Sequence, residues 1–312
     1  VDIDAGDLVS YSGDYDFYQQ QWQLRREQQA AQFARQQAML AKEQAFIDRF
    51  KARASHAAQV QSRVKKLEKI EKIDPPRERK IIEFDFRAPP RSGDDVATVE
   101  DVHKAYGEKV IYDGLNLLIR RQERWCVMGV NGAGKTTLLK LVAGASQPDR
   151  GSVRIGASVK LGYFAQHTME LLDPERTVLE TLQHEYPLAG LGVLRTLLGA
   201  FGFPGDSVEK RCAVLSGGEK ARLVLAIMLF DPPNFLVLDE PTNHLDIDTK
   251  EMLVRALHKF EGTLLFVSHD RTFLSALSNR VLELTAAGPR VYDGGYDEYV
   301  AASGQEAPGL RH

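Results

Sequence analysis

The sequence predicts an α/β domain preceded by a long antiparallel α-helical hairpin. Residues 19–73 contain neither Gly nor Pro and are rich in Gln, Ala, Arg, Lys and Glu, which is a composition of strong helix formers. From residue 81 onward, short β-rich runs alternate with helical patterns, as they do in α/β folds. A glycine-rich loop at residues 129–134, between an apolar strand and a helix, indicates which kind of α/β domain this is.

Length and composition exclude several classes of protein. The 312 residues leave room for about two domains, and 43% hydrophobic with 27% charged residues is an ordinary globular balance. The longest apolar run, residues 223–230, is far shorter than the ~18 residues that cross a bilayer. Cys126 and Cys212 are too few for a disulfide framework. We therefore expect a cytoplasmic protein without a membrane span.

The N-terminal residues repeat a segment from the C-terminal part of the chain. Residues 292–299 (YDGGYDEY) match residues 11–18 (YSGDYDFY) at an offset of 281, and residues 282–284 fall on residues 1–3 at the same offset. The chain thus opens as a domain of this kind closes, and it begins without Met. We expect residues 1–15 to be the C-terminal strand remnant of a removed first domain.

The helical segment carries two apolar stripes. They lie at Phe33, Leu40 and Ile47 on the first helix and at Val60, Val64, Leu67 and Ile70 on the second. One straight rod would expose both stripes to water, whereas a hairpin that turns near residues 51–56 buries one against the other. The Pro75-Pro76 pair is expected to end the second helix, because proline lacks the amide and disfavours helix in the residue before it.

Positive charge is concentrated in this hairpin. Residues 19–80 carry 15 Lys and Arg against 7 Asp and Glu, although the whole chain has a net charge of −3. A cationic outer face suits phosphate backbones, and the small number of exposed aromatic residues favours structured RNA over single strands. The alternative interpretation of this charge is that the hairpin is a solvated helical spacer, because Lys and Arg are also ordinary surface residues of helices.

Residues 129–137 (GVNGAGKTT) fit the phosphate-loop pattern G-x-x-x-x-G-K-[ST]. Glycines allow backbone N–H groups and the N-terminus of the following helix to face phosphates. Lys135 is expected to reach the β- and γ-phosphates, and the Thr136 hydroxyl to ligate Mg²⁺. The nucleotide-binding residues predicted in this loop are Gly129, Asn131, Gly132, Gly134, Lys135, Thr136 and Thr137.

Two further patterns point to the same chemistry. An apolar strand ends in Asp239 and Glu240, and the carboxyl end of a buried parallel strand is where such sheets place ligand groups. Asp239 suits a role near Mg²⁺, and Glu240 is the candidate that polarises the attacking water. Ser216, Gly217 and Gly218 open a helical run and predict a second anion site.

These residues resemble the nucleotide-binding domain of the ATP-binding cassette (ABC) superfamily and, within it, the ABC-F class, over nearly the whole chain. Residues 129–137 resemble Walker A, residues 235–240 resemble Walker B, and residues 215–219 resemble the signature motif, with Glu219 where transporters usually have Gln. The resemblance implies a P-loop fold with a mixed sheet, helices and a helical subdomain, and implies ATP hydrolysis with ATP and Mg²⁺ bound.

The resemblance also assigns residues that carry no strong signal of their own. Gln166 is placed like the Q-loop glutamine that reaches Mg²⁺ and the reacting centre, and His269 like the switch histidine. Tyr106 is placed like the aromatic residue that stacks on adenine, and residues 241–246 resemble the D-loop in its ABC-F form. The catalytic set implied is Lys135, Gln166, Glu240 and His269, and the metal set is Thr136, Gln166 and Asp239.

The implied domain organisation is that of an ABC-F linker followed by a second cassette. The predicted segments are the strand remnant 1–15, the basic hairpin linker 16–74, a connecting segment 75–95, the nucleotide-binding domain 96–303 and a disordered tail 304–312. In the superfamily, two cassettes sandwich ATP between the phosphate loop of one and the signature of the other. One cassette alone is therefore expected to hydrolyse ATP weakly, unless it self-pairs or meets the first domain.

The resemblance implies the ribosome as partner, with the hairpin contacting tRNA and rRNA. An ATPase subunit of a transporter is the alternative from another class, and an ABC-F relative that acts on DNA is a third reading. A basic hairpin cannot by itself distinguish RNA from DNA.

Overall fold

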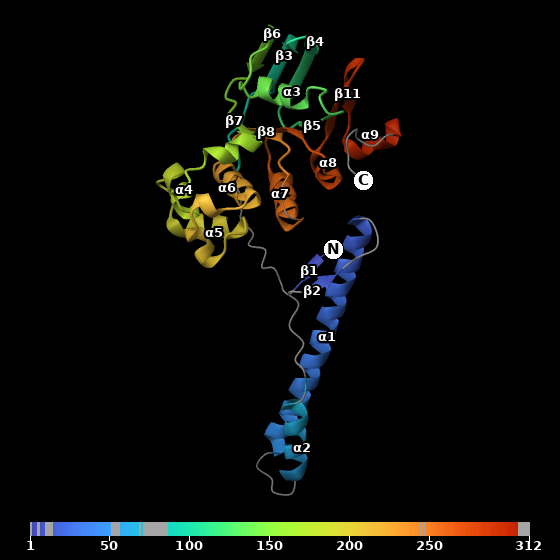
Figure 1. Cartoon of the computed structure of the whole chain (residues 1–312), viewed down its shortest axis with the longest axis vertical. Coiled ribbons are helices and arrows are strands. Elements are labelled where there is room, and N and C mark those ends of the chain that lie inside the picture. The colour runs from blue at the N-terminus through green and yellow to red at the C-terminus, as the bar shows by residue number, and fades with distance from the viewer. Residues whose placement is uncertain are drawn as a thin grey trace. The chain divides into compact units, whose positions relative to one another are not determined.

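The chain divides into two compact units, a helical unit over Val1–Ile81 and an α/β unit over Ile82–His312 (Figure 1). The computed structural model describes residues 2–4, 7–9, 15–50, 57–68, 70, 87–243, 245 and 247–304. The predicted turn at residues 51–56, the Pro75-Pro76 helix stop, the β-rich run at residues 81–86 and nearly all of the predicted tail lie outside the described residues.

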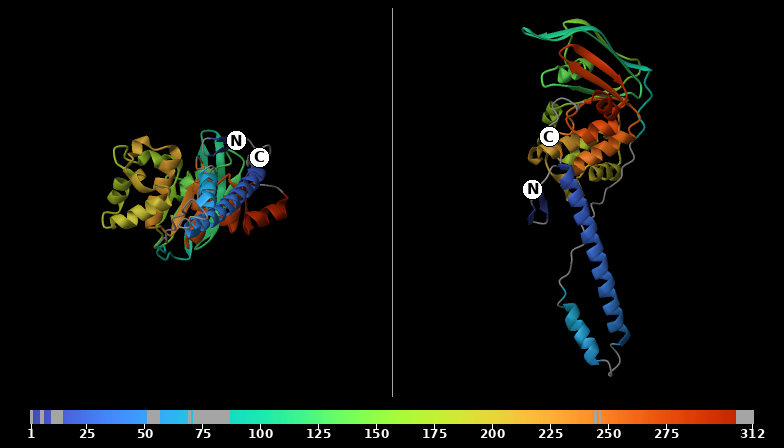
Figure 2. Two further views of the ribbon diagram at one scale, coloured as in Figure 1. Left: turned by 90° about the horizontal axis from the view of Figure 1, so that it is seen from below. Right: turned by 90° about the vertical axis from the view of Figure 1, so that its right-hand side faces the viewer.

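The helical unit contains the predicted hairpin. Its elements are β1 (Asp2–Asp4), β2 (Asp7–Val9), α1 (Tyr15–Phe50) and α2 (Ala57–Glu68). Helix α2 packs against the C-terminal part of α1, running in the opposite direction (Figure 2). The second helix was predicted to reach Pro75-Pro76, and residues 71–76 lie outside the described part of the chain. Helix α2 ends at Glu68, and Ile70 N donates to Leu67 O at 3.2 Å, an i→i−3 bond of the kind that closes helix ends.

One carboxylate and one aromatic ring hold α1 against α2. Glu43 accepts a hydrogen bond from Arg63, and Lys66 Nζ lies 3.6 Å from the same carboxylate. The hydrogen bond from Arg63 lowers the pKa of Glu43. The Arg63 guanidinium also lies 3.9 Å from the centre of the Phe46 ring, and Ile47 beside it is buried. Arg63 therefore links α2 to α1 through both its charge and its contact with the ring, while its side chain remains 40% exposed.

The α/β unit contains two sheets. A six-stranded sheet has the order β11-β10-β5-β9-β8-β7, all parallel except for β11. A three-stranded antiparallel sheet has the order β4-β3-β6. The strands are β3 (Asp95–Tyr106), β4 (Lys109–Arg120), β5 (Arg124–Gly129), β6 (Arg150–Ile155), β7 (Leu161–Phe164), β8 (Phe235–Asp239), β9 (Thr263–Val267), β10 (Arg280–Thr285) and β11 (Gly288–Asp293).

Helices cover the six-stranded sheet and form a separate cluster between β7 and β8 (Figure 1). They are α3 (Lys135–Val142), η2 (Gln166–Leu171), α4 (Val178–Glu185), α5 (Leu191–Ala200), η3 (Gly205–Glu209), η4 (Cys212–Val214), α6 (Gly217–Phe230), α7 (Ile247–Lys259), α8 (Arg271–Leu277) and α9 (Tyr296–Ser303). The elements from η2 to α6 make the helical subdomain. The predicted fold class is thereby confirmed.

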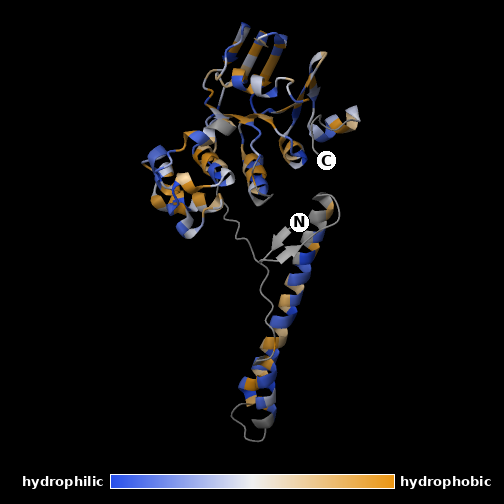
Figure 3. Cartoon of the chain, viewed as in Figure 1, coloured by the Kyte–Doolittle hydropathy of each residue, from blue (hydrophilic) through white to orange (hydrophobic). Residues whose placement is uncertain are grey.

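The central strands are buried on both faces. Alternate residues of β5 enter different cores, with Cys126 and Met128 in one and Trp125 and Val127 in the other. This follows from the two-residue period of a strand. Both faces are apolar because helices cover one, and α3 together with the three-stranded sheet covers the other. Hydrophobic residues accordingly gather in these strands, whereas α1 is mainly hydrophilic (Figure 3).

The internal repeat is also a structural repeat. In the β1–β2 hairpin Asp2 pairs with Val9, and in the β10–β11 hairpin Glu283 pairs with Arg290, at the same offset of 281 as in the sequence. Helices α1 and α9 begin at equivalent positions. Helix α9 ends at Gly304, which has a φ of 66°, the left-handed conformation that commonly stops a helix, whereas α1 continues to Phe50.

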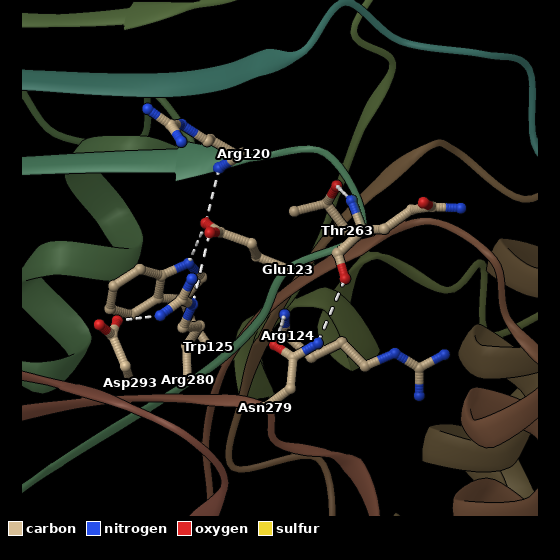
Figure 4. A network of polar contacts seen from close by, with 9 residues as sticks. Arg120, Glu123, Arg124, Trp125, Thr263, Asn279, Arg280 and Asp293 are labelled. Atoms are coloured by element: carbon tan, nitrogen blue, oxygen red, sulfur yellow. Dashed lines mark hydrogen bonds and ion pairs between the residues drawn. The ribbon is translucent and has the colours of Figure 1, made fainter.

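A network of polar contacts links the amino ends of β5, β9 and β10 to one another (Figure 4). The Glu123 carboxylate accepts hydrogen bonds from Arg120 N and Trp125 Nε1, both at 2.8 Å, and Arg280 Nε lies 3.4 Å away. Asn279 Oδ1 accepts from the Arg124 amide at 2.7 Å. The network leaves the opposite, carboxyl ends of these strands available for the site.

Candidate functional site

The predicted phosphate loop joins β5 to α3, and two of its glycines are required by sterics. Gly134 has a φ of 107°, and a Cβ there would lie 2.6 Å from Ile111 Cγ2. Gly129 has a φ of 150°, and its Cβ would lie 2.7 Å from Leu284 O. Any side chain at either position would therefore both strain the backbone and clash. Asn131 and Gly132 lie at the exposed tip of the loop.

A buried tyrosine that sequence reasoning missed supports this loop. Tyr112 is 5% exposed, and its hydroxyl donates to Gly134 O at 2.8 Å. Burial raises the pKa of Tyr112, so the hydroxyl stays a donor. The inward alternation of β4 could have marked the position as buried, but its partner Gly134 lies in another element.

Lys135 is held within the loop. Its Nζ donates to Gly129 O at 2.7 Å and to Val130 O at 3.3 Å. Burial lowers the pKa of Lys135, while the charges of Glu240 and Asp239 raise it. The ammonium is thus positioned beside the loop by backbone carbonyls and near two carboxylates.

Thr136 and Asp239, two of the predicted metal ligands, lie side by side. The Thr136 hydroxyl, in the first turn of α3, donates to Asp239 Oδ1 at 3.2 Å, at the end of β8. A hydroxyl and a carboxylate are hard oxygen donors, so this pair fits Mg²⁺. Gln166 begins η2 directly after β7 and Ala165, but its side chain lies outside the described part of the chain. Thr137 follows in the same turn of α3.

Glu240 has an unusual backbone conformation. Its φ is 50°, which is uncommon for a residue with a side chain and costs about 1–2 kcal/mol. Glu240 N donates to Val267 O at 3.0 Å, and Asn243 N donates to Glu240 O at 3.2 Å, so the neighbouring strand and turn hold this conformation. Such strain is found at functional sites.

The Glu240 carboxyl lies against His269, the predicted switch histidine. His269 N donates to Glu240 Oε2 at 3.3 Å, and His269 Nε2 lies 3.2 Å from Glu240 Oε1. Burial raises the pKa of Glu240 to about 7, and the nearby Asp239 charge adds to this, whereas the His269 amide and Lys135 act against it. A carboxyl with this pKa is suited to accept a proton near neutral pH.

Thr136, Asp239 and Glu240 line one cavity of about 410 Å³. Its lining comprises Thr136, Lys140, Tyr163, Phe164, Ala165, Met169, Glu170, Ala221, Asp239, Glu240 and Asn243. Tyr163 was not predicted as a site residue. The chain thus places the Thr136 hydroxyl at the start of α3 and the carboxyl groups of Asp239 and Glu240 at the end of β8 and just after it around one cavity.

Tyr106 lies beside the loop through the β3–β4 turn. It pairs with Lys109 across the two strands, and Lys109 Nζ lies 3.0 Å from the position that a Cβ on Gly132 would occupy. Tyr106 is 52% exposed. Its accessible ring at the edge of the loop is compatible with the predicted stacking on a base.

The signature residues do not line this cavity. Ser216 caps α6, because its hydroxyl accepts from Glu219 N at 3.2 Å and Glu219 accepts from Ser216 N at 2.9 Å. Gly217 and Gly218 form the bare first turn of α6. The first turn of α6, where the sequence predicted a second anion site, therefore lies apart from this cavity.

Comparison with known proteins identifies the family. Family models described as "ABC transporter" match residues 1–86 and 112–243. "Probable ATP-binding protein YheS" of Escherichia coli (strain K12) is 40% identical over 299 residues, which cover 96% of this chain and 47% of that protein. The chain belongs to the ATP-binding cassette family. Its relatives include "ABC transporter F family member 2" of Arabidopsis thaliana, 38% identical over 80% of this chain and 37% of that protein.

A solved cassette supports the same fold. The dimeric post-hydrolysis structure of the ATP-binding cassette MJ0796 bound to ADP and Pi matches with a TM-score of 0.54 and 24% identity, over 63% of this chain and 98% of that one. This ABC chain spans about half the length of the curated relatives it matches. Within the described ranges, no helix is both long and apolar enough to cross a membrane.

The raised pKa of Glu240 predicts a pH-dependent cost to the stability of the nucleotide-free cassette. Between pH 4.5 and about 7 the folded chain holds a proton here that the unfolded chain has lost, so stability falls as pH rises and the full cost is present above about pH 7. Glu240→Gln should therefore raise the free energy of unfolding by about 1–3 kcal/mol at pH 8, with no gain near pH 4.5. Denaturant unfolding at both pH values measures this.

Glu170 provides the control for this measurement. It lines the same cavity but is exposed, so its carboxyl keeps its hydration, and Glu170→Gln should give no gain at pH 8. A Glu240→Gln protein that is less stable than the unmodified chain at pH 8 would contradict the prediction.

Proposed function

We propose that this cassette binds ATP with Mg²⁺ and hydrolyses it to ADP and phosphate. The observation that carries the proposal is the position of Glu240, a carboxyl with a pKa raised to about 7 that shares one cavity with Thr136 and Asp239. A water molecule held by this carboxylate would face the γ-phosphate bound at the loop.

Each predicted residue has a place in this reaction. The loop residues Gly129, Asn131, Gly132, Gly134 and Thr137 bind the phosphates, and Tyr106 stacks on the base. Lys135 would leave its two carbonyl partners for the β- and γ-phosphates. Thr136, Asp239 and Gln166 would hold Mg²⁺, which neutralises phosphate charge.

The chemical step needs a base and a well-positioned water. Glu240 takes a proton from the water as the water oxygen attacks the γ-phosphorus and the bond to the β–γ bridging oxygen breaks. His269 holds the carboxyl through its amide and its ring. Lys135 compensates the charge that develops on the phosphoryl oxygens.

The complete site requires a second cassette. Ser216, Gly217 and Gly218 offer an anion site on a surface apart from the cavity, and we infer that they cover the ATP bound by a partner cassette. The partner is the first cassette of the same protein or a second copy of this chain. Closure would exclude water from the reacting phosphate, so the single cassette should hydrolyse ATP weakly.

We infer that the helical hairpin acts on the ribosome in the cytoplasm, where it contacts tRNA and rRNA. Two observations support this inference. The chain is similar to ABC-F proteins, and the described helices of the hairpin carry exposed basic residues, which include Arg35, Lys42, Arg49 and Lys65. Phosphate backbones bind such surfaces through counterion release.

The hairpin role predicts a salt-dependent effect of charge removal. Changing Lys42, Arg49 and Lys65 to Gln should weaken ribosome binding in the presence of ATP and flatten the slope of log affinity against log salt by about 2–3. Co-sedimentation of the Glu240→Gln protein, with and without the three changes, measures this. The slope should fall because fewer counterions are released.

A matched control removes three exposed cations from the cassette. Changing Arg255, Lys259 and Arg290 to Gln alters the net charge equally and should leave ribosome binding unchanged. An equal loss of ribosome affinity in the hairpin variant and in the cassette variant would overturn the proposed role of the hairpin. If free DNA displaces the protein from ribosomes more readily than free RNA does, the alternative of an ABC-F relative that acts on DNA is favoured.

A further inference from the structure

Asp149 forms hydrogen bonds with three successive residues of β3 that lie next to Tyr106. The Asp149 amide donates to His103 O at 2.9 Å. Its carboxylate accepts from Lys104 Nζ at 2.8 Å through one oxygen and from Ala105 N at 2.7 Å through the other. These contacts lower the pKa of Asp149. Asp149 ends the loop that follows α3, so it ties the strand that carries Tyr106 to the segment that follows the phosphate-loop helix.

The lysine held by Asp149 lies over the Tyr106 ring. Lys104 Nζ is 5.4 Å from the centre of the ring, within the range of a cation–π interaction. The Lys104 side chain is only 13% exposed, so its charge is poorly screened by water. Tyr106 itself is 52% exposed, although Lys104 covers one side of it.

We propose that Asp149 and Lys104 are positioning residues for the nucleotide base. Asp149 fixes Lys104, and Lys104 holds the Tyr106 ring by one face, so that the opposite face is presented to the base. This inference rests on the proposed function, in which Tyr106 stacks on adenine. It assigns a role to Asp149 and Lys104, which are not among the residues proposed to bind phosphate or metal.

The physical advantage is preorganisation. A free tyrosine side chain at the end of a strand would lose rotamer freedom when a base stacks on it, which weakens binding. A ring already held by a cation has lost that freedom before the nucleotide arrives. Loss of the clamp should therefore weaken only ligands that have a base.

The test compares ATP with inorganic triphosphate, which lacks the base and ribose. Calorimetry on the full chain with Mg²⁺ gives both dissociation constants. For Lys104→Gln and Asp149→Asn, the ATP constant should rise about 3- to 10-fold, and the triphosphate constant should stay within about twofold of the unmodified chain. The ratio of the two constants is read within each protein, so a partly unfolded preparation does not imitate the effect.

Two variants sharpen the comparison. Lys104→Arg keeps a cation near the ring and should retain most of the ATP affinity. Arg154→Gln breaks another ion pair of the same three-stranded sheet, the one between Arg154 and Glu100, and should leave both constants unchanged.

Tyr106→Ala separates this inference from the proposed function. If it leaves ATP affinity unchanged, the base does not stack on Tyr106 and the proposed base site is wrong. If Tyr106→Ala weakens ATP binding while Lys104→Gln and Asp149→Asn do not, the clamp alone is overturned. Equal weakening of ATP and triphosphate by the clamp variants also overturns it, because the two residues would then act on the phosphate site.

Discussion

Replacing Glu240 with Gln should reduce ATP hydrolysis by about 10²- to 10⁴-fold and change ATP affinity little. The amide has the size of the carboxyl and can keep the contact with the His269 amide, but it cannot take a proton from water. Phosphate release measured at high protein concentration, where cassettes can pair, together with the ATP dissociation constant, tests both parts.

The control for this variant is Glu170→Gln. Glu170 is a second carboxylic acid that lines the same cavity and has no role in the proposed reaction. The Glu170→Gln protein should retain turnover. Undiminished hydrolysis by the Glu240→Gln protein would remove Glu240 from its role as the base. Loss of ATP binding along with turnover would show instead that the carboxyl contributes to the structure of the site.

Replacing Lys135 with Ala should weaken ATP binding about 10- to 100-fold and abolish measurable hydrolysis. Charge-assisted hydrogen bonds contribute about 1.5–3 kcal/mol each, and a half-buried ammonium is less screened than one in water. In the nucleotide-free chain its bonds go to Gly129 O and Val130 O, so the alanine variant also frees two carbonyls that would then face the phosphates.

Lys140 gives a matched control, because it lies in the last turn of α3, the helix that begins at Lys135, and lines the cavity beside Thr136. Lys140→Ala removes the same charge from the same helix and should retain ATP affinity to within a few-fold. Calorimetric titration of both variants decides the matter. Unchanged affinity of the Lys135→Ala protein would show that the loop is not the nucleotide site.

The fold was largely predictable from local patterns. The absence of Gly and Pro predicted the helices of the hairpin, and Ile47 of the predicted apolar seam is buried. Within the described residues, the β-rich runs predicted strands that the structure contains. The bounds of helix α2, Ala57–Glu68, were less predictable, since helix ends depend on hydrogen bonds and contacts that a stripe of apolar residues does not specify.

The candidate site was predictable where one short motif carries its chemistry. The position of the predicted phosphate loop between β5 and α3 and that of Asp239 at the end of β8 were predictable, because each follows from a motif of a few consecutive residues. Tyr112 and Asp149 were not, because their partners Gly134 and Lys104 lie in other elements, 22 and 45 residues away in the chain.

The sequence alone determined which chemical groups this protein has and in which order they lie on its helices, strands and loops, because backbone propensity, apolar periodicity and loop motifs act over a few residues. Only the tertiary structure decided the pKa of Glu240, its left-handed backbone and the clamp behind Tyr106. Burial and charge depend on which distant segments pack together, and a linear pattern of residues does not contain those distances.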